Sequence, residues 1–436
     1  MKSKLLMSIK SLSCSEYCFS LAGSSSTIYD FGYQINNFEG IINLTKERKK
    51  EIFSMKKALI VASVASMIGQ FNISNIKILQ SLGFKVDVAA NFSHPGTISI
   101  ENAQDLKEFL EANKVNVYDI PFQRNPFHPN NWLAFRILNR VMSNNAYDLV
   151  HSHSPVGGLV GRILGYSHKA DNIYTAHGFH FYKGGTRIGW LLFYPIEKIL
   201  SYFTDTFITI NEEDYALAKK CFKMKSLHLV NGVGVNLEKF SPVSYNEKAQ
   251  LKLMLGLEQD KKYLIFVGEL NANKNQSILI EMMEQLSKTR KDIVLLLVGN
   301  GVLLNTYRQL IKIKGLEELV LLLGYRKDIP DLMRVSDIAL SSSKREGLPV
   351  NLLEAMATGL PLIVSNCRGN RDLVEDGKNG YITENSTVDE FIVAITRILD
   401  DEFLYQQFSQ YSLLSSEKYS LERVEVKMKE IYSNSF

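Results

Sequence analysis

The sequence predicts an α/β protein with two doubly wound domains, each built on its own parallel sheet. Its 436 residues exceed what one ordinary hydrophobic core accommodates. Short apolar, β-branched runs alternate with longer helical patterns, which is typical of parallel α/β units. Near the middle, residues 231–242 contain two glycines and a proline and lose the hydrophobic periodicity, so we expect the domain boundary there.

The apolar runs are short and apolar on both faces, as buried parallel strands must be. In the first half the predicted strands are 58–64, 85–90, 115–120, 148–153, 172–176, 206–210 and 227–230. In the second half they are 263–268, 293–298, 319–323, 338–342, 361–365 and 380–383. In doubly wound sheets, ligands bind outside the carboxyl ends of the strands, so the site should lie in the crevice between the two domains.

The domain limits follow from these patterns. Residues 1–54 contain scattered serines and a basic cluster but lack the charge order and cleavage site of a secretory signal. We expect them to be a disordered extension or the product of an upstream start, because Met55 and the apolar run after it resemble the beginning of a domain. The first domain is then predicted at 55–235, the second at 236–415, and a last segment at 416–436.

Composition narrows the class of partner and the compartment. The net charge of +4 does not indicate a nucleic-acid partner, and it is compatible with an anionic substrate or an anionic membrane surface. Four scattered cysteines favour a reducing, cytoplasmic compartment. The most apolar window, 188–203, is short for a bilayer and is interrupted by Pro195 and Glu197, so we interpret it as a core helix, with an interfacial helix as the alternative.

Two carboxylates, Glu346 and Glu354, stand eight residues apart on either side of a Gly-Leu-Pro turn. Pro349 suits the first turn of a helix, which places Glu346 in the entering loop and Glu354 one to two turns inside. The free N–H groups of that helix start can hold a phosphate, while the carboxylates accept hydrogen bonds from hydroxyls. This pattern suits a sugar nucleotide. The alternative is a helix start with acidic residues that complement its dipole.

The Glu-x7-Glu arrangement, followed by Ala355-Met-Ala-Thr-Gly-Leu-Pro361, resembles retaining glycosyltransferases of family 4, which have the GT-B fold. The resemblance extends from about Lys56 to the C-terminus. It implies a first domain for the acceptor, a second for the nucleotide-sugar donor, and a last helix that crosses back onto the first domain. The catalytic residues it implies are Glu346, His177 and Lys274. The donor-binding residues it implies are Glu354, Gly347, Leu348, Pro349, Val350, Gly268, Gly324, Tyr325, Arg345 and Gly69.

In that family the residue matching Glu354 binds both ribose hydroxyls, and the one matching Glu346 lies against the donor sugar. The alternative for Glu346 is a simple ion pair with Lys344 or Arg345. A buried, unpaired Glu354 would be costly, so we expect it to have a partner. The family hinge Asn-Gly-Val-Asp also has a counterpart here, with Gly234 in the place of the aspartate.

Lys274 follows a predicted strand and Gly268, on a polar loop from which a cation can reach a diphosphate. The resemblance makes it the cation that neutralises the departing nucleotide. Many family members carry a second cation where this chain has Glu269. That cation is therefore missing or is supplied from elsewhere. The candidates to supply it are Arg345, Arg326, Arg368 and Arg371.

His177 follows a strand of the first domain in Thr175-Ala-His-Gly-Phe-His-Phe181, and the resemblance places it in the cleft near the sugar. The alternative is a histidine satisfied by loop or core partners. His151, His153 and His180 are nearby in the sequence, but no recognised zinc motif links them to a carboxylate or cysteine. The sequence also has no Asp-x-Asp pair to hold a divalent metal. We therefore expect no metal and no other cofactor.

Three softer assignments complete the predicted site. Gly69 is expected in a loop after the first strand, before a helix that begins near Asn72. Gly324 and Tyr325 follow a strand and would present their backbone to the nucleobase, although a simple glycine turn is the ordinary alternative. Acceptor specificity is expected in the loops 91–100 and 122–132, where no motif identifies the ligand.

The predicted reaction is transfer of a sugar from a nucleotide diphosphate to a hydroxyl, with retained anomeric configuration. Within the family, the segment Ser342-Ser-Lys-Arg-Glu-Gly-Leu-Pro-Val resembles the sequences of bacterial capsule and exopolysaccharide enzymes. That implies a UDP-linked hexose or N-acetylhexosamine, a lipid-linked saccharide acceptor, and peripheral contact with the inner membrane face. The alternatives are a UDP-sugar 2-epimerase of the same fold, a two-lobed sugar-binding protein, and a non-catalytic partner subunit.

Overall fold

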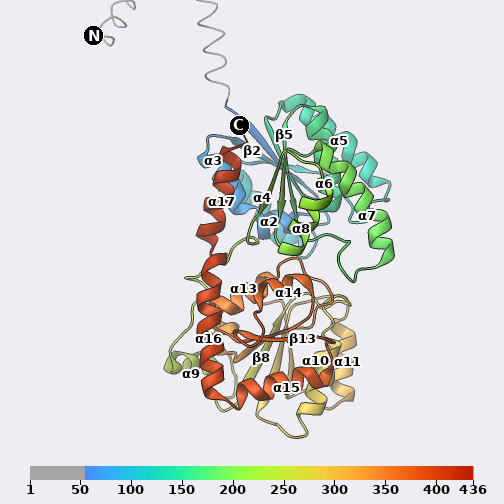
Figure 1. Cartoon of the computed structure of the whole chain (residues 1–436). Coiled ribbons are helices and arrows are strands. Elements are labelled where there is room, and N and C mark those ends of the chain that lie inside the picture. Colours follow the sequence, from blue (N-terminus) through green and yellow to red (C-terminus); the bar gives the residue numbers. More distant parts are fainter. Residues whose placement is uncertain (1–54, 436) are drawn as a thin grey trace, which may run out of the picture. The chain divides into compact units, whose positions relative to one another are not determined.

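Two parallel β-sheets form the centres of two α/β domains in the computed structural model, which describes residues 55–435 (Figure 1). The expected extension over residues 1–54 lies outside the described residues. Both sheets are parallel throughout, as the apolar runs of the sequence predict.

The first sheet has seven strands in the order β3-β2-β1-β4-β5-β6-β7, and the second has six in the order β10-β9-β8-β11-β12-β13. The first set is β1 (Lys57–Val61), β2 (Lys85–Ala90), β3 (Asn116–Asp119), β4 (Leu149–His153), β5 (Asp171–Ala176), β6 (Thr206–Thr209) and β7 (Ser226–Leu229). The second set is β8 (Lys262–Val267), β9 (Ile293–Val298), β10 (Val320–Gly324), β11 (Ile338–Ser341), β12 (Leu362–Ser365) and β13 (Gly380–Thr383). Every predicted strand is confirmed. The strand order reverses beside β1 and beside β8, which marks the switch points where ligands bind in such sheets.

Helices cover both faces of each sheet. Those of the first domain are α2 (Ala65–Phe71), α3 (Ile73–Ser81), α4 (Ile100–Ala112), α5 (Asn130–Asn145), α6 (Pro155–Ser167), α7 (Arg187–Leu200), η1 (Ser201–Phe203) and α8 (Glu212–Cys221). The rest of the chain forms α9 (Tyr245–Met254), α10 (Ser277–Leu286), α11 (Leu304–Ile313), α12 (Ile329–Val335), α13 (Val350–Ala357), α14 (Arg368–Leu373), α15 (Val388–Leu399), α16 (Glu402–Ser416), η2 (Glu417–Tyr419) and α17 (Leu421–Ser433). Among residues 55–435, no helix combines the length and the apolar character needed to cross a bilayer.

Successive side chains along a strand point to opposite faces of the sheet, so each sheet has a hydrophobic core on both of its faces. In β8, Tyr263 and Ile265 pack into one hydrophobic cluster, while Leu264 and Phe266 pack into another. This is the period-two geometry of a strand that is covered on both faces. Burial of these apolar side chains is the main favourable term in the stability of each domain.

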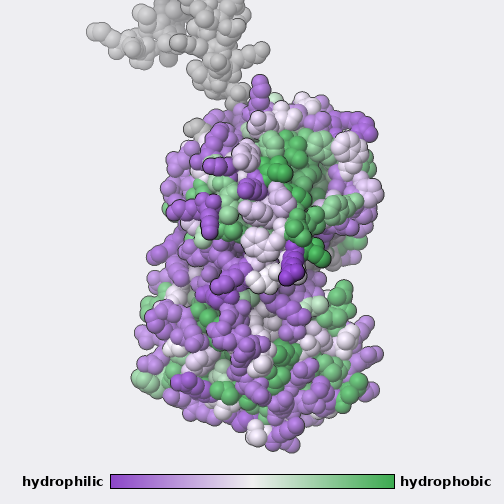
Figure 2. All heavy atoms as spheres, turned by 45° about the vertical axis from the view of Figure 1, so that its right-hand side comes forward, coloured by the Kyte–Doolittle hydropathy of each residue, from purple (hydrophilic) through white to green (hydrophobic). Residues whose placement is uncertain are grey.

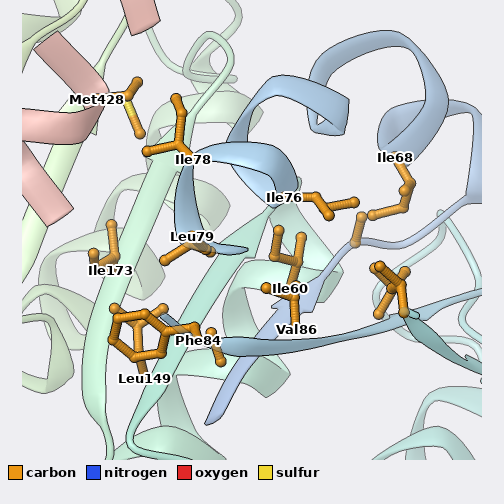
Figure 3. Close-up of a cluster of buried hydrophobic side chains, with 14 of the residues drawn as sticks. Ile60, Ile68, Ile76, Ile78, Leu79, Phe84, Val86, Leu149, Ile173 and Met428 are labelled. Atoms are coloured by element: carbon orange, nitrogen blue, oxygen red, sulfur yellow. The ribbon is translucent and has the colours of Figure 1, made fainter. Parts of the chain in front are cut away.

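The last helix of the chain belongs to the core of the first domain. Met428 of α17 lies beside Ile78 of α3, above the strands that carry Leu149 and Ile173 (Figure 3). A hydrogen bond from Ser74 Oγ to Glu425 Oε1, at 2.7 Å, adds a polar contact between α3 and α17. In Figure 1, α16 lies along the second domain and α17 along the first, so the chain's end spans both.

Two chain segments cross between the domains and are hydrogen-bonded to each other. Val235 donates its N–H to the carbonyl oxygen of Tyr419 at 2.9 Å, and Leu421 donates to that of Val235 at 2.9 Å. Gly234 has a φ of +81°, and a Cβ there would lie 2.6 Å from the Cα of Leu421. A side chain is therefore excluded at the hinge position where the resembling family has an aspartate.

The helix expected from about Asn72 is confirmed as α3, which has Asn72 as its N-cap and begins at Ile73. Two other local predictions are wrong. The segment before α3 is not a loop but helix α2, which begins at Ala65 because Ala65 and Ile68 bury an apolar face directly after β1. Gly69 is therefore inside a helix and faces Leu106 of α4. Pro349 precedes the first turn of α13 as its N-cap, with φ of −75° but an extended ψ of 113°, so the helix begins at Val350.

The buried side of α17 should stabilise the first domain. Val424 is buried and Val426 is exposed on the same helix. We expect Val424→Ala to lower the free energy of unfolding by about 1 to 3 kcal/mol and Val426→Ala to change it by less than about 0.5 kcal/mol. Both changes alter helix propensity equally, so their difference reports packing. Denaturant unfolding measures it, and equal effects would show that α17 does not pack as described.

Candidate functional site

A buried arginine joins the two domains. The side chain of Arg368, on α14 of the second domain, is 2% exposed. Its Nη1 forms an ion pair with Asp214 Oδ1 of α8 at 2.6 Å, and its Nη2 donates to the carbonyl oxygen of Phe179 at 2.7 Å. Its Nε donates to the carbonyl oxygen of Glu346 at 2.9 Å. One guanidinium thus holds the loop after β5 against the loop before α13.

Further contacts between α8 and α14 surround this arginine. Arg371 Nη2 pairs with Glu213 Oε2 at 2.8 Å, and the N–H of Glu212 donates to Asp372 Oδ2 at 3.2 Å. The backbones also approach closely, because a Cβ on Gly347 would lie 2.2 Å from the carbonyl oxygen of His177. Only glycine fits at Gly347 in this arrangement.

A cavity of about 270 Å³ lies where these loops meet. The first domain contributes His177, His180 and Phe193 to its wall, and the second contributes Asn273, Arg345 and Glu346. The structure therefore brings together four of the predicted site residues from both domains, namely His177, Arg345, Glu346 and Gly347. They meet at the carboxyl ends of the strands, as expected for doubly wound sheets.

Lys274 is the ion-pair partner of Glu346. Its Nζ lies 2.6 Å from Glu346 Oε1, with both side chains largely shielded from solvent. The lysine loop is fixed by Asn271, whose Oδ1 accepts from the N–H of Lys274 at 3.0 Å, and by Ser342, whose Oγ donates to its carbonyl oxygen at 2.8 Å. The alternative pairing of Glu346 with Lys344 or Arg345 is therefore wrong. An ammonium has three donors, so Lys274 can bind an anion without leaving Glu346.

Three of the four candidate cations are already paired. Arg326 pairs with its neighbour Asp328, and Arg368 and Arg371 pair with carboxylates of α8. Within the described part of the chain, Arg345 has no carboxylate partner, and it lines the cavity. Glu269 is exposed. Arg345 is thus the cation best placed to act with Lys274.

The histidines of the first domain form a buried, neutral network. His177 Nε2 is 3.1 Å from His153 Nδ1, and the His153 ring lies tilted against that of His151 with centroids 4.1 Å apart. His151 in turn contacts Tyr432 Oη of α17 at 2.7 Å and Thr175 Oγ1 at 2.8 Å. Burial lowers the pKa of His177 to about 4, so its imidazole is neutral near pH 7. Among residues 55–435, no group of three or more His, Cys, Asp or Glu side chains is arranged to hold a metal ion.

His180 also lines the cavity wall. Its ring stacks on Phe193 of α7, with centroids 4.7 Å apart. Burial lowers the pKa of His180 to about 4, and the charges of Arg345 and Arg368 add to that effect. A neutral imidazole at this position can exchange hydrogen bonds with a hydroxyl but does not add charge to the cavity.

Glu354 lies outside this cavity, on the inner part of α13. No described residue gives its half-buried carboxyl group a hydrogen bond or ion pair, so the partner expected for Glu354 is not supplied by the described part of the chain. Burial raises the pKa of Glu354 to about 7, and Lys239 in the linker opposes that shift. A desolvated carboxylate without a partner is suited to accept hydrogen bonds from a ligand.

The remaining predicted residues lie around the ends of the second sheet. Gly268 follows β8 beside the side chain of Lys274, and Gly324 ends β10, where its carbonyl oxygen accepts from Gly299 at 2.8 Å. Tyr325 is largely exposed. Leu348 is buried against the linker at Gly232, and Val350 begins α13. These positions do not line the cavity that contains Glu346.

Sequence reasoning missed the residues that fix the loops. Asn273 Nδ2 donates to the carbonyl oxygen of Arg345 at 3.0 Å, and Asn351 Nδ2 donates to that of Val267 at 2.8 Å. The sequence indicates Asp214 only as one of the acidic residues at a helix start. In the structure, the side chain of Asn211 caps α8 by accepting a hydrogen bond from the N–H of Asp214. No signal in the sequence pairs Asp214 with an arginine 154 positions away.

The two arginines of α14 provide a matched test of the domain contact. Arg368→Met leaves Asp214 buried without a counter-charge, so we expect it to cost about 3 to 5 kcal/mol of stability. Arg371→Met breaks a more exposed pair and should cost about 1 kcal/mol or less. Thermal unfolding measures both.

If Arg368→Met is too unstable to purify, the double variant with Asp214→Asn, which removes the uncompensated charge, should recover part of the loss. Equal costs for the two single changes would contradict a buried role for Arg368.

The carboxyl of Glu354 makes stability depend on pH. Folding raises its pKa from the ordinary 4.5 to about 7, so its favourable contribution is complete below about pH 4.5 and is lost as the pH rises through 7. Glu354→Gln removes this loss. At about pH 8 we expect the free energy of unfolding of the variant to exceed that of the wild type by about 1 to 2 kcal/mol, a value that allows for solvent screening of this half-buried group. At about pH 5 we expect little difference.

Unfolding at the two pH values measures this effect, with Glu281→Gln as the control because Glu281 is the exposed fifth residue of α10, as Glu354 is the fifth of α13. A gain that does not change with pH would contradict the assignment.

Known proteins resemble both halves of the chain. Residues 71–211 match the family model described as glycosyl transferase 4-like, and residues 248–413 match that of glycosyl transferases group 1. EpsD of Bacillus subtilis (strain 168), named as a glycosyltransferase, is 35% identical over 382 residues, which covers 87% of this chain and 96% of EpsD. An Escherichia coli UDP-Gal:α-D-GlcNAc-diphosphoundecaprenol α-1,3-galactosyltransferase is 32% identical over 272 residues, 61% of this chain and 70% of that enzyme.

Solved structures share the arrangement of the two domains. Anabaena HepE in complex with UDP and glucose aligns with a TM-score of 0.70 at 19% identity, over 87% of this chain and all of that one. Sucrose-phosphate synthase of Thermosynechococcus elongatus aligns with a TM-score of 0.71 at 18% identity, over 87% of this chain and 98% of the other. At these identities the likeness shows the fold alone.

Proposed function

Because the chain belongs to the glycosyltransferases of the group 1 and 4-like family, we propose that it transfers a sugar from a UDP-sugar to a hydroxyl of a lipid-linked saccharide, with retained anomeric configuration. The chain is a glycosyltransferase with the GT-B fold. The donor, the acceptor and the stereochemistry are the proposed part.

The observation that supports this proposal is the Lys274–Glu346 pair beside Arg345, facing His177 across one cavity. Lys274 and Arg345 supply two cations on neighbouring loops, which together can neutralise the charge of a leaving diphosphate. The first N–H groups of α13, at Val350 and Asn351, lack helical partners, as at every helix start. They can donate hydrogen bonds to the negative charge of the same diphosphate. Preorganised donors of this kind stabilise the transition state electrostatically and require no metal ion.

In the proposed reaction, the acceptor hydroxyl approaches the anomeric carbon on the face of the leaving group. The bond from that carbon to the diphosphate oxygen breaks as the bond to the acceptor oxygen forms, and the hydroxyl proton passes to the departing phosphate. No covalent nucleophile is needed. Glu346, held by Lys274, orients the sugar, and the neutral imidazole of His177 hydrogen-bonds a hydroxyl. The unpartnered carboxyl of Glu354 accepts from the ribose hydroxyls.

The relatives support the choice of donor and acceptor. The Escherichia coli relative is named for transfer from UDP-Gal to a diphosphoundecaprenol-linked sugar, and HepE was solved with UDP and glucose. We therefore propose a UDP-hexose or UDP-N-acetylhexosamine donor and a lipid-linked acceptor in capsule or exopolysaccharide synthesis. Such an acceptor places the enzyme at the cytoplasmic face of the membrane, as a peripheral protein.

The test is release of UDP from a panel of UDP-sugars, with purified protein and a lipid-acceptor extract, with and without chelator. We expect acceptor-dependent release from one donor, unaffected by chelator, and a loss of about 100-fold or more in Lys274→Ala. Lys314→Ala is the matched control, because Lys314 pairs with Glu284 at 2.5 Å on the outside of the same domain. It should retain activity.

The outcomes separate the alternatives. Turnover of the sugar without an acceptor would show an epimerase. Donor binding without turnover would show a non-catalytic partner, with Glu269→Arg the first change to restore the family's second cation. Equal losses in Lys274→Ala and Lys314→Ala would show that the Lys274–Glu346 pair is not the reacting site.

A further inference from the structure

Helix α7 carries a stripe of exposed apolar side chains. Ile188, Leu191 and Ile199 are 72%, 79% and 60% exposed, and Pro195 and Tyr202 continue the stripe. Their spacing of three and four residues places them on one face of the helix. Figure 2 shows a band of apolar residues on the side of the molecule that carries α7 in Figure 1. No described segment covers this face.

The opposite face of the same helix is part of the domain. Phe193 and Tyr194 pack against the aromatic cluster of the first domain, and Glu197 is buried. The sequence interpretation of 188–203 as a core helix therefore holds for one face only. The outer face is also apolar, which a helix exposed only to water does not need.

Helix α5 adds a second exposed surface on the other side of α6, which both helices contact. It exposes Trp132 and Leu133, and the ring of Trp132 stacks on Phe135. Tryptophan is typical of surfaces that enter the interface of a bilayer, because its ring is apolar and its N–H is polar.

The exposed charges of these two helices have one sign. They are Arg136 and Arg140 on α5, and Arg187 and Lys198 on α7. The only acidic residue in either helix, Glu197, is turned inward and pairs with the buried Arg162 at 2.9 Å. The whole chain has 46 acidic and 50 basic residues, so the lack of exposed acidic residues on these two helices is a local asymmetry. At the Tyr202 end of the stripe, the neighbouring groove contains the half-buried Asp171 and Asp205 together with Lys169, Lys223 and Lys225. The exposed cations of α5 and α7 beside an apolar stripe complement an anionic lipid surface.

This helix also adjoins the cavity. Phe193, on the inner face of α7, lines the cavity and stacks on His180. Trp190 Nε1 donates to the carbonyl oxygen of Tyr182 at 3.2 Å, which fixes the start of α7 to the loop that carries His177 and His180. A lipid-linked substrate held by a bilayer on the outer face would thus have its saccharide within one helix width of the cavity.

We propose that the outer face of α7, with the exposed residues of α5, binds an anionic lipid bilayer and so presents the lipid-linked acceptor to the cavity. The second part rests on the proposed function, whereas lipid binding does not. The cationic surroundings favour a bilayer over a second copy of this chain, because two such faces would repel each other.

The test is binding of the full chain to phosphatidylcholine vesicles with and without phosphatidylglycerol. We expect binding to the anionic vesicles, weakened by salt, and a loss of about tenfold or more in the double variant Ile188→Glu/Leu191→Glu. The control is Ile313→Glu/Leu253→Glu, which introduces the same charge at exposed Ile and Leu residues of the second domain. The control should bind as the wild type does.

A second variant, Ile188→Ser/Leu191→Ser, separates loss of apolar surface from added charge and should also bind more weakly. Absence of vesicle binding by the wild type, or equal binding by all variants, would overturn the proposal. So would a dimer in light scattering that the α7 variants dissociate, since that would make a second copy the occupant.

UDP release with a detergent-solubilised acceptor distinguishes this result from the proposed function. The α7 variants should retain that activity if the surface acts only through the membrane. Vesicle binding without any transfer by the wild type would contradict the transferase proposal and leave the lipid surface standing. Transfer by a wild type that does not bind vesicles would contradict the lipid surface and leave the transferase proposal standing.

Discussion

The buried guanidinium of Arg368 is the contact on which the arrangement of the site depends. It satisfies the carbonyl oxygens of Phe179 and Glu346 and the carboxylate of Asp214 at once. A buried charge of this kind is costly unless it is paired and hydrogen-bonded, so the two loops are held where all three bonds can form. The cavity that brings Glu346 to His177 exists between those loops. Without Arg368, the loop that carries Glu346 and the loop that carries His177 would keep only the more exposed contacts of Arg371 and Asp372 with α8 to hold them together.

The crossing segments supply a second constraint. Val235 pairs with Ser420, so the two connections between the domains are bonded to each other rather than moving separately. Helix α17 then carries Tyr432 to His151, whose neighbour His153 contacts His177. The end of the chain is thereby linked, through buried side chains, to the wall of the cavity. The packing of α17 on the first domain therefore also fixes the orientation of the histidines in the cavity wall.

Local patterns in the sequence were sufficient for the strands, because an apolar run bounded by turn residues needs only its own residues to be recognised. They were also sufficient for Glu346 in a loop and Glu354 in the helix after it. Pairings across the fold were not predictable: Lys274 with Glu346, and Arg368 with Asp214, join residues 72 and 154 positions apart. Gly69 was misplaced because helix α2 begins at the end of β1. For 188–203 the sequence left a core helix and an interfacial helix open, since composition does not show which apolar face of a helix lacks a cover.

The most direct test of the central claim is a crystal structure of the full chain with its UDP-sugar. The account predicts the diphosphate between Lys274, Arg345 and the first N–H groups of α13, the ribose hydroxyls on Glu354, and the sugar against Glu346 with His177 opposite. The three bonds of Arg368 should remain. A nucleotide bound away from these residues, for example in the groove lined by Lys169, Lys223 and Lys225 at the far edge of the first sheet, would contradict it.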